Sequence, residues 1–165
     1  MKSIPTPALA ALAAFTLPAL AACAPEADAP QQDSTSQAPA AAGLTISNPR
    51  VVLAPVAGNP AAVYFDLSYA GTGPVTLTGV AVEGAGMTMI HDYTESAGKM
   101  QMGMAGPVEL AAGTPVIFAP GGLHVMAMDP GSELKPGATA RVTLTLSDGA
   151  SQTVDAPVRA AGEDR

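Results

Sequence analysis

The residues of this sequence best suited to chemistry are methionines and histidines, and they are confined to one region. The chain has two histidines and eight methionines. Apart from Met1, all of them fall between positions 87 and 128: Met87, Met89, His91, Met100, Met102, Met104, His124, Met126 and Met128. Methionines that serve only to fill a core should be scattered over every strand of a domain. Their confinement to the region that holds both histidines therefore indicates a common site.

The spacing within this region is that of extended strands. In each of three segments, 87–91, 100–104 and 124–128, methionines and histidines occupy every second position. Successive side chains of a strand point to opposite faces, so each segment presents these side chains on one face. We expect the three segments to bring imidazole and thioether groups together at one pocket.

Thioether and imidazole groups together favour copper. Thioether sulfur is a soft ligand that selects Cu(I), and imidazole also binds copper, whereas Mg²⁺ and Ca²⁺ prefer oxygen ligands. Any one of these residues, taken alone, would be better interpreted as a core histidine or a gap-filling methionine. The joint pattern reverses that balance and predicts a Cu(I) site.

Composition excludes several other classes of function. The only cysteine is Cys23, so a blue-copper electron-transfer site, which needs a cysteine thiolate beside two histidines, has no ligand in the folded region. No nucleophile or metalloprotease motif occurs, and we expect a protein that is not an enzyme. The net charge is −7 and no cluster of Lys or Arg is present, which argues against nucleic acid as a partner.

The first part of the chain is predicted to direct export and anchoring. Residues 1–22 combine an early lysine with a short apolar run, as in a signal peptide. The following Leu20-Ala21-Ala22-Cys23 resembles the lipobox of bacterial lipoproteins, which would make Cys23 the lipidated residue. We expect a protein anchored on the periplasmic side of the envelope. Ala24, rather than Asp, after the cysteine favours the outer membrane.

The remaining chain divides into a linker, one domain and a tail. Residues 23–43 comprise the lipidated cysteine and a flexible Pro- and Ala-rich linker. Residues 44–160 are expected to form the copper-binding domain, and 161–165 a short tail. Segments 44–54, 61–70, 74–84 and 140–148 are rich in Val, Leu, Thr and Tyr and are bounded by Gly, Pro, Asn or Asp. They predict an all-β domain, an antiparallel sandwich or a small barrel.

The spacing of four of these residues resembles a known family. His91, Met102, His124 and Met126 form the pattern H-x10-M-x21-H-x-M, which is similar to the signature of the periplasmic copper chaperones called PCu(A)C. Residues 98–102, 120–123 and 62–67 also resemble that family, and the resemblance extends over residues 45–158.

This resemblance implies a cupredoxin-like Greek-key fold of short antiparallel strands. It also implies one Cu(I) bound by His91, Met102, His124 and Met126, and delivery of copper toward the binuclear copper site of cytochrome c oxidase. The partners would be a copper-accepting oxidase subunit and a Sco-type thiol protein. The other methionines match no family ligand and are expected to surround the site or to bind copper transiently: Met87, Met89, Met100, Met104 and Met128.

The chain also departs from the family, and two alternatives stay open. Its first strand has no Trp, and the His- and Met-rich C-terminal extension of some members is absent. An envelope Cu(I) buffer would carry the same ligands as a chaperone. A lipoprotein that binds only other proteins would keep its function if His91 and Met102 were replaced. For a chaperone we expect His124 and Met126 to lie close to a loop at a partly exposed rim, because a partner's ligands must reach the metal.

Overall fold

The computed structural model describes residues 40–163, which form ten strands. No helix occurs within this range, and hence no helix that is long and apolar enough to cross a membrane. The predicted signal peptide, Cys23 and most of the predicted linker lie outside the described residues. The strands are β1 (Leu44–Val52), β2 (Ala61–Tyr69), β3 (Val75–Val82), β4 (Ala85–Ser96), β5 (Lys99–Met104), β6 (Val108–Leu110), β7 (Val116–Phe118), β8 (His124–Pro130), β9 (Thr139–Leu146) and β10 (Ser151–Arg159).

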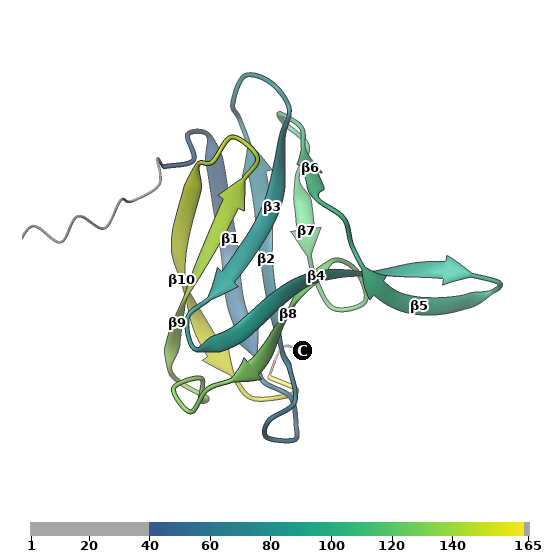
Figure 1. The fold of residues 1–165 in the computed structure, drawn as a ribbon, viewed down its shortest axis with the longest axis vertical. Coiled ribbons are helices and arrows are strands. Elements are labelled where there is room, and N and C mark those ends of the chain that lie inside the picture. Colours follow the sequence, from purple (N-terminus) through teal and green to yellow (C-terminus); the bar gives the residue numbers. More distant parts are fainter. Residues whose placement is uncertain (1–39, 164–165) are drawn as a thin grey trace, which may run out of the picture. The chain divides into compact units, whose positions relative to one another are not determined.

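The strands form two layers (Figure 1). One layer has the order β5-β4-β8-β2-β1, with β7 also paired to β2, and the other has the order β10-β9-β3-β6. The prediction of an all-β, cupredoxin-like sandwich is confirmed. One pair differs from the expected antiparallel pattern, because β1 and β10 run parallel where they join the layers, with Val51 opposite Val158. Strand direction at such a junction depends on how the whole chain is connected, which local sequence patterns do not report.

The core lies between the layers and is built by strict alternation. Along β2, every second residue from Ala61 to Tyr69 is buried, as expected for a strand with one face against the core. Phe65 and Phe118 are both fully buried, with ring centroids 4.3 Å apart. The aliphatic side chains of β9 complete this interior from the opposite layer.

The register of the first layer determines which residues of β8 face the core. Ala127 lies opposite Ala61, and Val125 lies opposite Val63. Since paired residues of a sheet share a face, Val125 and Ala127 point inward, and both are fully buried. The residues that alternate with them, His124 among them, therefore belong to the outer face of the layer.

The second half of β4 and the whole of β5 form a hairpin that extends away from the sandwich (Figure 1). Its two-residue turn consists of Ala97 and Gly98, both with positive φ, at 53° and 75°. Two positive φ values are the requirement of the type I′ turn, whose twist matches that of a hairpin. Every residue of β5 is exposed, so the hairpin holds its shape mainly through its own pairing.

Candidate metal centre

All nine methionines and histidines of the region share the outer face of three neighbouring strands. β4 lies between β5 and β8, and the register places the residues opposite one another in successive pairs. These pairs are Met87 with Met128, Met89 with Met126, His91 with His124, His91 with Met104, Tyr93 with Met102, and Glu95 with Met100. The prediction that segments 87–91, 100–104 and 124–128 are extended is thus confirmed.

His91 is the centre of the four predicted ligands. His124 lies directly opposite it on β8, and Met126 lies diagonally opposite on the same strand. Met102 lies diagonally opposite on β5, because its direct partner is Tyr93. Diagonal neighbours on one face are separated by roughly 7–8 Å between backbones, which long side chains can bridge. Met102 and Met126 are therefore diagonal neighbours of His91 on opposite sides of it, level with Tyr93 and Met89 along β4.

The two imidazole rings are close together and differently oriented. Their centroids are 5.9 Å apart and their planes meet at 85°. Imidazole nitrogens bind transition metals at roughly 2 Å, so one ion between the rings can contact both. The ring separation is therefore compatible with a shared ion.

A backbone carbonyl determines which ring nitrogen of His124 carries the proton. Its Nδ1 lies 2.8 Å from the carbonyl oxygen of Gly122. A carbonyl oxygen only accepts hydrogen bonds, so Nδ1 must carry the proton and donate it. In the neutral ring, the lone pair is then at Nε2. An outer hydrogen bond of this kind orients metal-binding histidines in many sites.

His91 has a buried nitrogen that no protein group satisfies. Its Nδ1 has no hydrogen-bond partner among the described residues, although the atom is shielded from solvent. A buried polar atom without a partner carries a cost in free energy, and such atoms are rare in folded proteins. An unsatisfied imidazole nitrogen within this group of ligands is consistent with a metal-binding role.

His124 and Met126 were both predicted to be partly exposed at the rim of the site. This is correct for Met126 but wrong for His124. Met126 is half-buried, whereas His124 is only 5% exposed. His124 does lie close to a loop, as predicted, because it is the first residue of β8. The ring of Tyr93 stacks on it, with centroids 5.6 Å apart and an interplanar angle of 28°. The exposed side of the site is instead formed by β5, where Met102 is 47% exposed.

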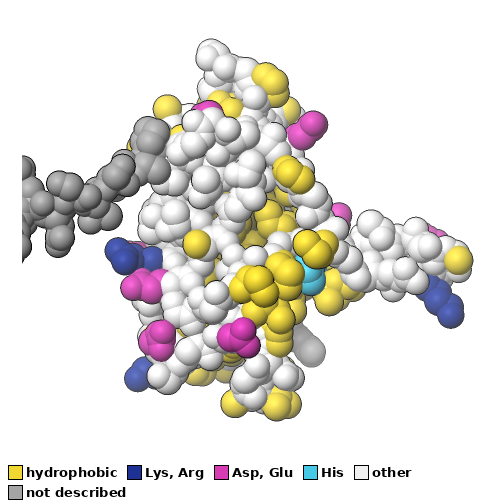
Figure 2. Space-filling view, in the orientation of Figure 1, with side chains coloured by type: hydrophobic (Ala, Val, Ile, Leu, Met, Phe, Trp, Pro, Cys, Tyr) yellow, Lys and Arg dark blue, Asp and Glu magenta, His cyan; other side chains and the backbone are white. Residues whose placement is uncertain are grey.

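Tyr93 was not identified as a site residue from the sequence. It lies two positions after His91, so the alternation that grouped the other residues places it on the same face. Its ring covers His124 and its backbone partner is Met102. Tyr93 therefore contacts one predicted ligand and neighbours another. Figure 2 shows the histidine surface among hydrophobic side chains where the hairpin leaves the sandwich.

The donors on this face fit a soft metal. Within residues 40–163, no group of three or more His, Cys, Asp or Glu residues is placed to hold an ion. Methionines neighbour both histidines on this face, so thioether sulfur is available to complete the coordination of an ion there. Sulfur and imidazole together suit Cu(I), whereas the oxygen-preferring cations Mg²⁺ and Ca²⁺ find too few ligands here.

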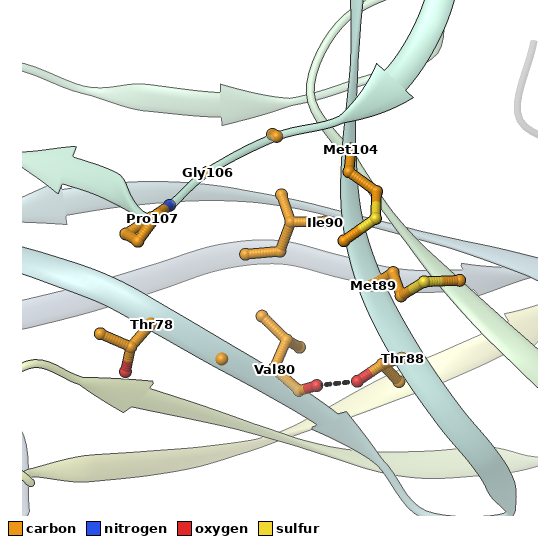
Figure 3. Close-up of a pocket in the computed structure, with 10 residues that line it drawn as sticks. Thr78, Val80, Thr88, Met89, Ile90, Met104, Gly106 and Pro107 are labelled. Atoms are coloured by element: carbon orange, nitrogen blue, oxygen red, sulfur yellow. Dashed lines mark hydrogen bonds between the residues drawn. The ribbon is translucent and has the colours of Figure 1, made fainter.

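A pocket of about 260 Å³ lies beside this face but is separate from the ligand group. It opens where β4 meets β3 of the other layer, and none of the four predicted ligands lines it. Figure 3 shows Met89 and Met104 at one border of this pocket, and Thr78 and Pro107 at another. Thr88 donates a hydrogen bond to the carbonyl of Val80 and so ties the layers together there.

A family comparison covers nearly the whole described domain. A family model described as "Putative lipoprotein LpqE-like" matches residues 44–158. A curated relative, "Putative lipoprotein Lxx21020" from Leifsonia xyli subsp. xyli (strain CTCB07), is 31% identical over 100 residues. This match includes 59% of the present chain, and the chain spans 60% of the length of the relative.

Solved structures share the fold. The copper-bound PCuAC domain from PmoF2 aligns over 75% of this chain and 98% of its own, with a TM-score of 0.60 and 23% identity. The solution structure of CuI-DR1885 from Deinococcus radiodurans aligns over 82% of this chain and 89% of its own, with a TM-score of 0.58 and 28% identity. The fold expected from the PCu(A)C resemblance is thus confirmed.

Proposed function

Because the chain belongs to the LpqE-like lipoprotein family, we propose that its β domain is a Cu(I)-binding metallochaperone of the cell envelope. Copper is the cargo of such a protein, and the chain itself catalyses no reaction. The ligands are His91, Met102, His124 and Met126. Similarity to the copper-bound PmoF2 domain and to CuI-DR1885 supports this function.

The observation that carries the proposal is the arrangement around His91. His124 pairs directly with His91, Met102 and Met126 are its diagonal neighbours, and all four share the outer face of one layer, which supports a common site. The tautomer of His124 leaves the lone pair of Nε2 for an ion, and Nδ1 of His91 has no hydrogen-bond partner within residues 40–163. Strands hold their side chains more rigidly than loops do, which favours pre-arranged ligands at His91, His124 and Met126, whereas Met102 lies on the exposed hairpin.

Delivery requires that a partner can reach the ion. On this account the incoming ligand approaches from the β5 side, where Met102 is exposed, while Tyr93 shields His124 from solvent. We propose that the acceptor is the copper-binding subunit of cytochrome c oxidase, with a Sco-type thiol protein acting alongside. This assignment rests on the resemblance to the PCu(A)C family.

We also propose that a lipid on Cys23 holds the domain at the periplasmic side of the envelope, with the outer membrane favoured. The family description and the name of the Leifsonia relative both refer to lipoproteins, which supports an anchor. A domain attached through a linker of about 20 residues would sample a radius of roughly 25 Å around its anchor, by the scaling of flexible chains.

The test is a Cu(I) competition titration against a coloured chelator under anaerobic conditions. We expect the protein to bind Cu(I) with a Kd below about 1 nM. Each of the single substitutions His91→Ala, Met102→Leu, His124→Ala and Met126→Leu should raise the Kd by at least about 10-fold, since even residues that only orient ligands contribute that much.

The matched control is Met100→Leu. Met100 is on the same face and strand as Met102 but lies opposite Glu95, beyond Tyr93 and away from the histidines. Its replacement should leave the Kd within about twofold of the wild-type value, because the variant keeps all four ligands. Equal losses for Met100→Leu and Met102→Leu would contradict the ligand assignment. An unchanged Kd in His91→Ala would remove His91 from the ligand set, and failure of the wild-type protein to bind Cu(I) would favour a protein that binds only other proteins.

A further inference from the structure

Three methionines on the outer face remain together after the four proposed ligands are assigned. Met87 pairs with Met128 across β4 and β8, and Met89 is the next outward residue after Met87. Met89 in turn pairs with Met126, so the three adjoin the proposed histidine site. Side chains of directly paired residues begin about 5 Å apart, and methionine has three rotatable bonds with which to bring its sulfur to a common point.

These methionines do not fill the core. The residues of β4 between and after them, Thr88 and Ile90, pair with buried residues of β8 and belong to the inner face. Met87 is 55% exposed, while Met89 and Met128 are half-buried. Strand positions that face solvent usually carry β-branched, aromatic or charged residues, and flexible Met has no packing advantage there. Packing therefore does not explain three methionines at neighbouring outward positions.

We propose that Met87, Met89 and Met128 form a second Cu(I) site made of thioethers alone. Thioether sulfur retains Cu(I) without carrying a charge, and it binds the harder divalent cations poorly. This site lies beside the histidine site, and Met126 stands between the two because it pairs with Met89 and follows His124 by two residues. The inference rests on the proposed copper function.

A second ion would give the domain a route for its cargo. The pairs Met87–Met128, Met89–Met126 and His91–His124 succeed one another along the same two strands. An ion can thus pass from thioethers near the exposed Met87 to the imidazoles by exchanging one ligand at a time. The all-thioether site would bind more weakly than the site with two imidazoles, because imidazole is the better donor of the two.

The test is to count Cu(I) ions by native mass spectrometry of the full-length protein in the presence of a weak chelator. We expect two ions on the wild-type protein and one on the Met87→Leu, Met128→Leu double variant. The remaining ion should have an unchanged Kd in the competition titration. The His91→Ala, His124→Ala variant should keep one weakly bound ion, and Met100→Leu should keep two.

The outcomes separate this proposal from the proposed function. One ion on the wild-type protein, lost in His91→Ala, His124→Ala, would overturn the second site and leave the function intact. Two ions on the Met87→Leu, Met128→Leu variant would also overturn it. No bound ion at all would contradict both proposals. If the double variant does not fold, Met87→Leu alone provides the test, because Met87 is exposed and its replacement should leave packing unchanged.

Discussion

At the scale of single residues, the environment of each histidine differs and suggests a division of roles. The Gly122 carbonyl orients His124, and Tyr93 covers its ring. His91 has an unsatisfied Nδ1 and neighbours every other proposed ligand. One histidine is therefore fixed by protein contacts, whereas the other has no hydrogen-bond partner at one nitrogen in the part of the chain that the structure describes. Tyr93 is the residue best placed to control access to the fixed ligand.

Replacement of Tyr93 should change the rate of copper exchange more than the affinity. In Tyr93→Ala, His124 loses the ring that shields it, so we expect Cu(I) to be released to a chelator at least several-fold faster. Tyr93→Phe keeps the stacked ring and should release copper at the wild-type rate. Stopped-flow measurement with excess chelator checks both variants. Identical rates in all three proteins would mean that Tyr93 does not limit access.

The sequence predicted which of these side chains share one strand face, because alternation alone places side chains on faces. The same rule applied to Tyr93 would have included it. The burial of His124 was beyond such reasoning. It depends on a ring stacked from the neighbouring strand and on the carbonyl of Gly122, and neither contact has a signature in the spacing of the ligands.

At the scale of elements, the hairpin of β4 and β5 carries a proposed ligand but has few buried contacts. It supplies Met102, yet every residue of β5 is exposed. Segments with few buried contacts open locally at low cost in free energy. The stability of the hairpin should therefore depend on its turn and on its backbone pairing, and local opening would move Met102 away from the histidines.

Ala97→Asn should stabilise the hairpin. Ala97 has a φ of 53°, a left-handed conformation that costs residues other than Gly about 1–2 kcal/mol and is more readily adopted by Asn. Asn followed by Gly is also a preferred type I′ turn. We expect slower amide hydrogen exchange across residues 93–104, with a gain of up to about 1 kcal/mol. Gly98→Ala, at a φ of 75°, should have the opposite effect. Equal exchange in all three proteins would show that the turn does not limit opening.

A pH-dependent ion pair joins β9 to Glu83, the residue that follows the end of β3. The Arg141 guanidinium, 2.8 Å from the Glu83 carboxylate, lowers the pKa of Glu83 through a hydrogen bond and its charge. A carboxyl group whose pKa is lower in the folded state stabilises the fold above its unfolded pKa, and this contribution is lost as the pH falls through the folded value.

Glu83→Gln should therefore be slightly less stable than the wild-type protein at pH 7 and equally stable well below the lowered pKa. The difference should be small, because both side chains are largely exposed and such pairs are screened by solvent. Urea midpoints of the two proteins at neutral and acidic pH provide the measurement. A larger difference at acidic pH would contradict the sign of this linkage.

At the scale of the whole domain, the core and the proposed ligands lie on opposite faces of the same layer. The inner face packs against the second layer around Phe65 and Phe118, and the outer face carries the methionines and histidines. Core substitutions should therefore lower the free energy of unfolding without removing a ligand. Outer-face substitutions such as Met→Leu should remove a proposed ligand and leave the free energy of unfolding nearly unchanged.

Phe65→Ala should lower the free energy of unfolding by about 3–5 kcal/mol, the usual cost of removing a buried aromatic ring. Phe65 is fully buried against Phe118. The matched control is Ile117→Ala, since Ile117 is the neighbour of Phe118 on β7 but is 58% exposed and should cost less than about 1 kcal/mol. Urea denaturation checks both values. Similar losses of unfolding free energy in the two variants would contradict a core centred on Phe65 and Phe118.

Much of the architecture was predictable because the strands follow simple rules. The segments predicted at 44–54, 61–70, 74–84 and 140–148 correspond to β1, β2, β3 and β9 within two residues at each end. The parallel pairing of β1 with β10 was not predictable, nor was the extension of the hairpin away from the sandwich. Both depend on contacts between segments far apart in the chain, and the sequence of either segment alone contains no record of them.

The central claim is that one Cu(I) is bound by two imidazoles and two thioethers on the outer face. Copper X-ray absorption spectroscopy of the protein loaded with one equivalent of Cu(I) tests it most directly, because the spectrum distinguishes nitrogen from sulfur neighbours. We expect two nitrogen and two sulfur ligands, and loss of the nitrogen contribution in the His91→Ala, His124→Ala variant. A shell of sulfur alone, or one unchanged in that variant, would contradict it.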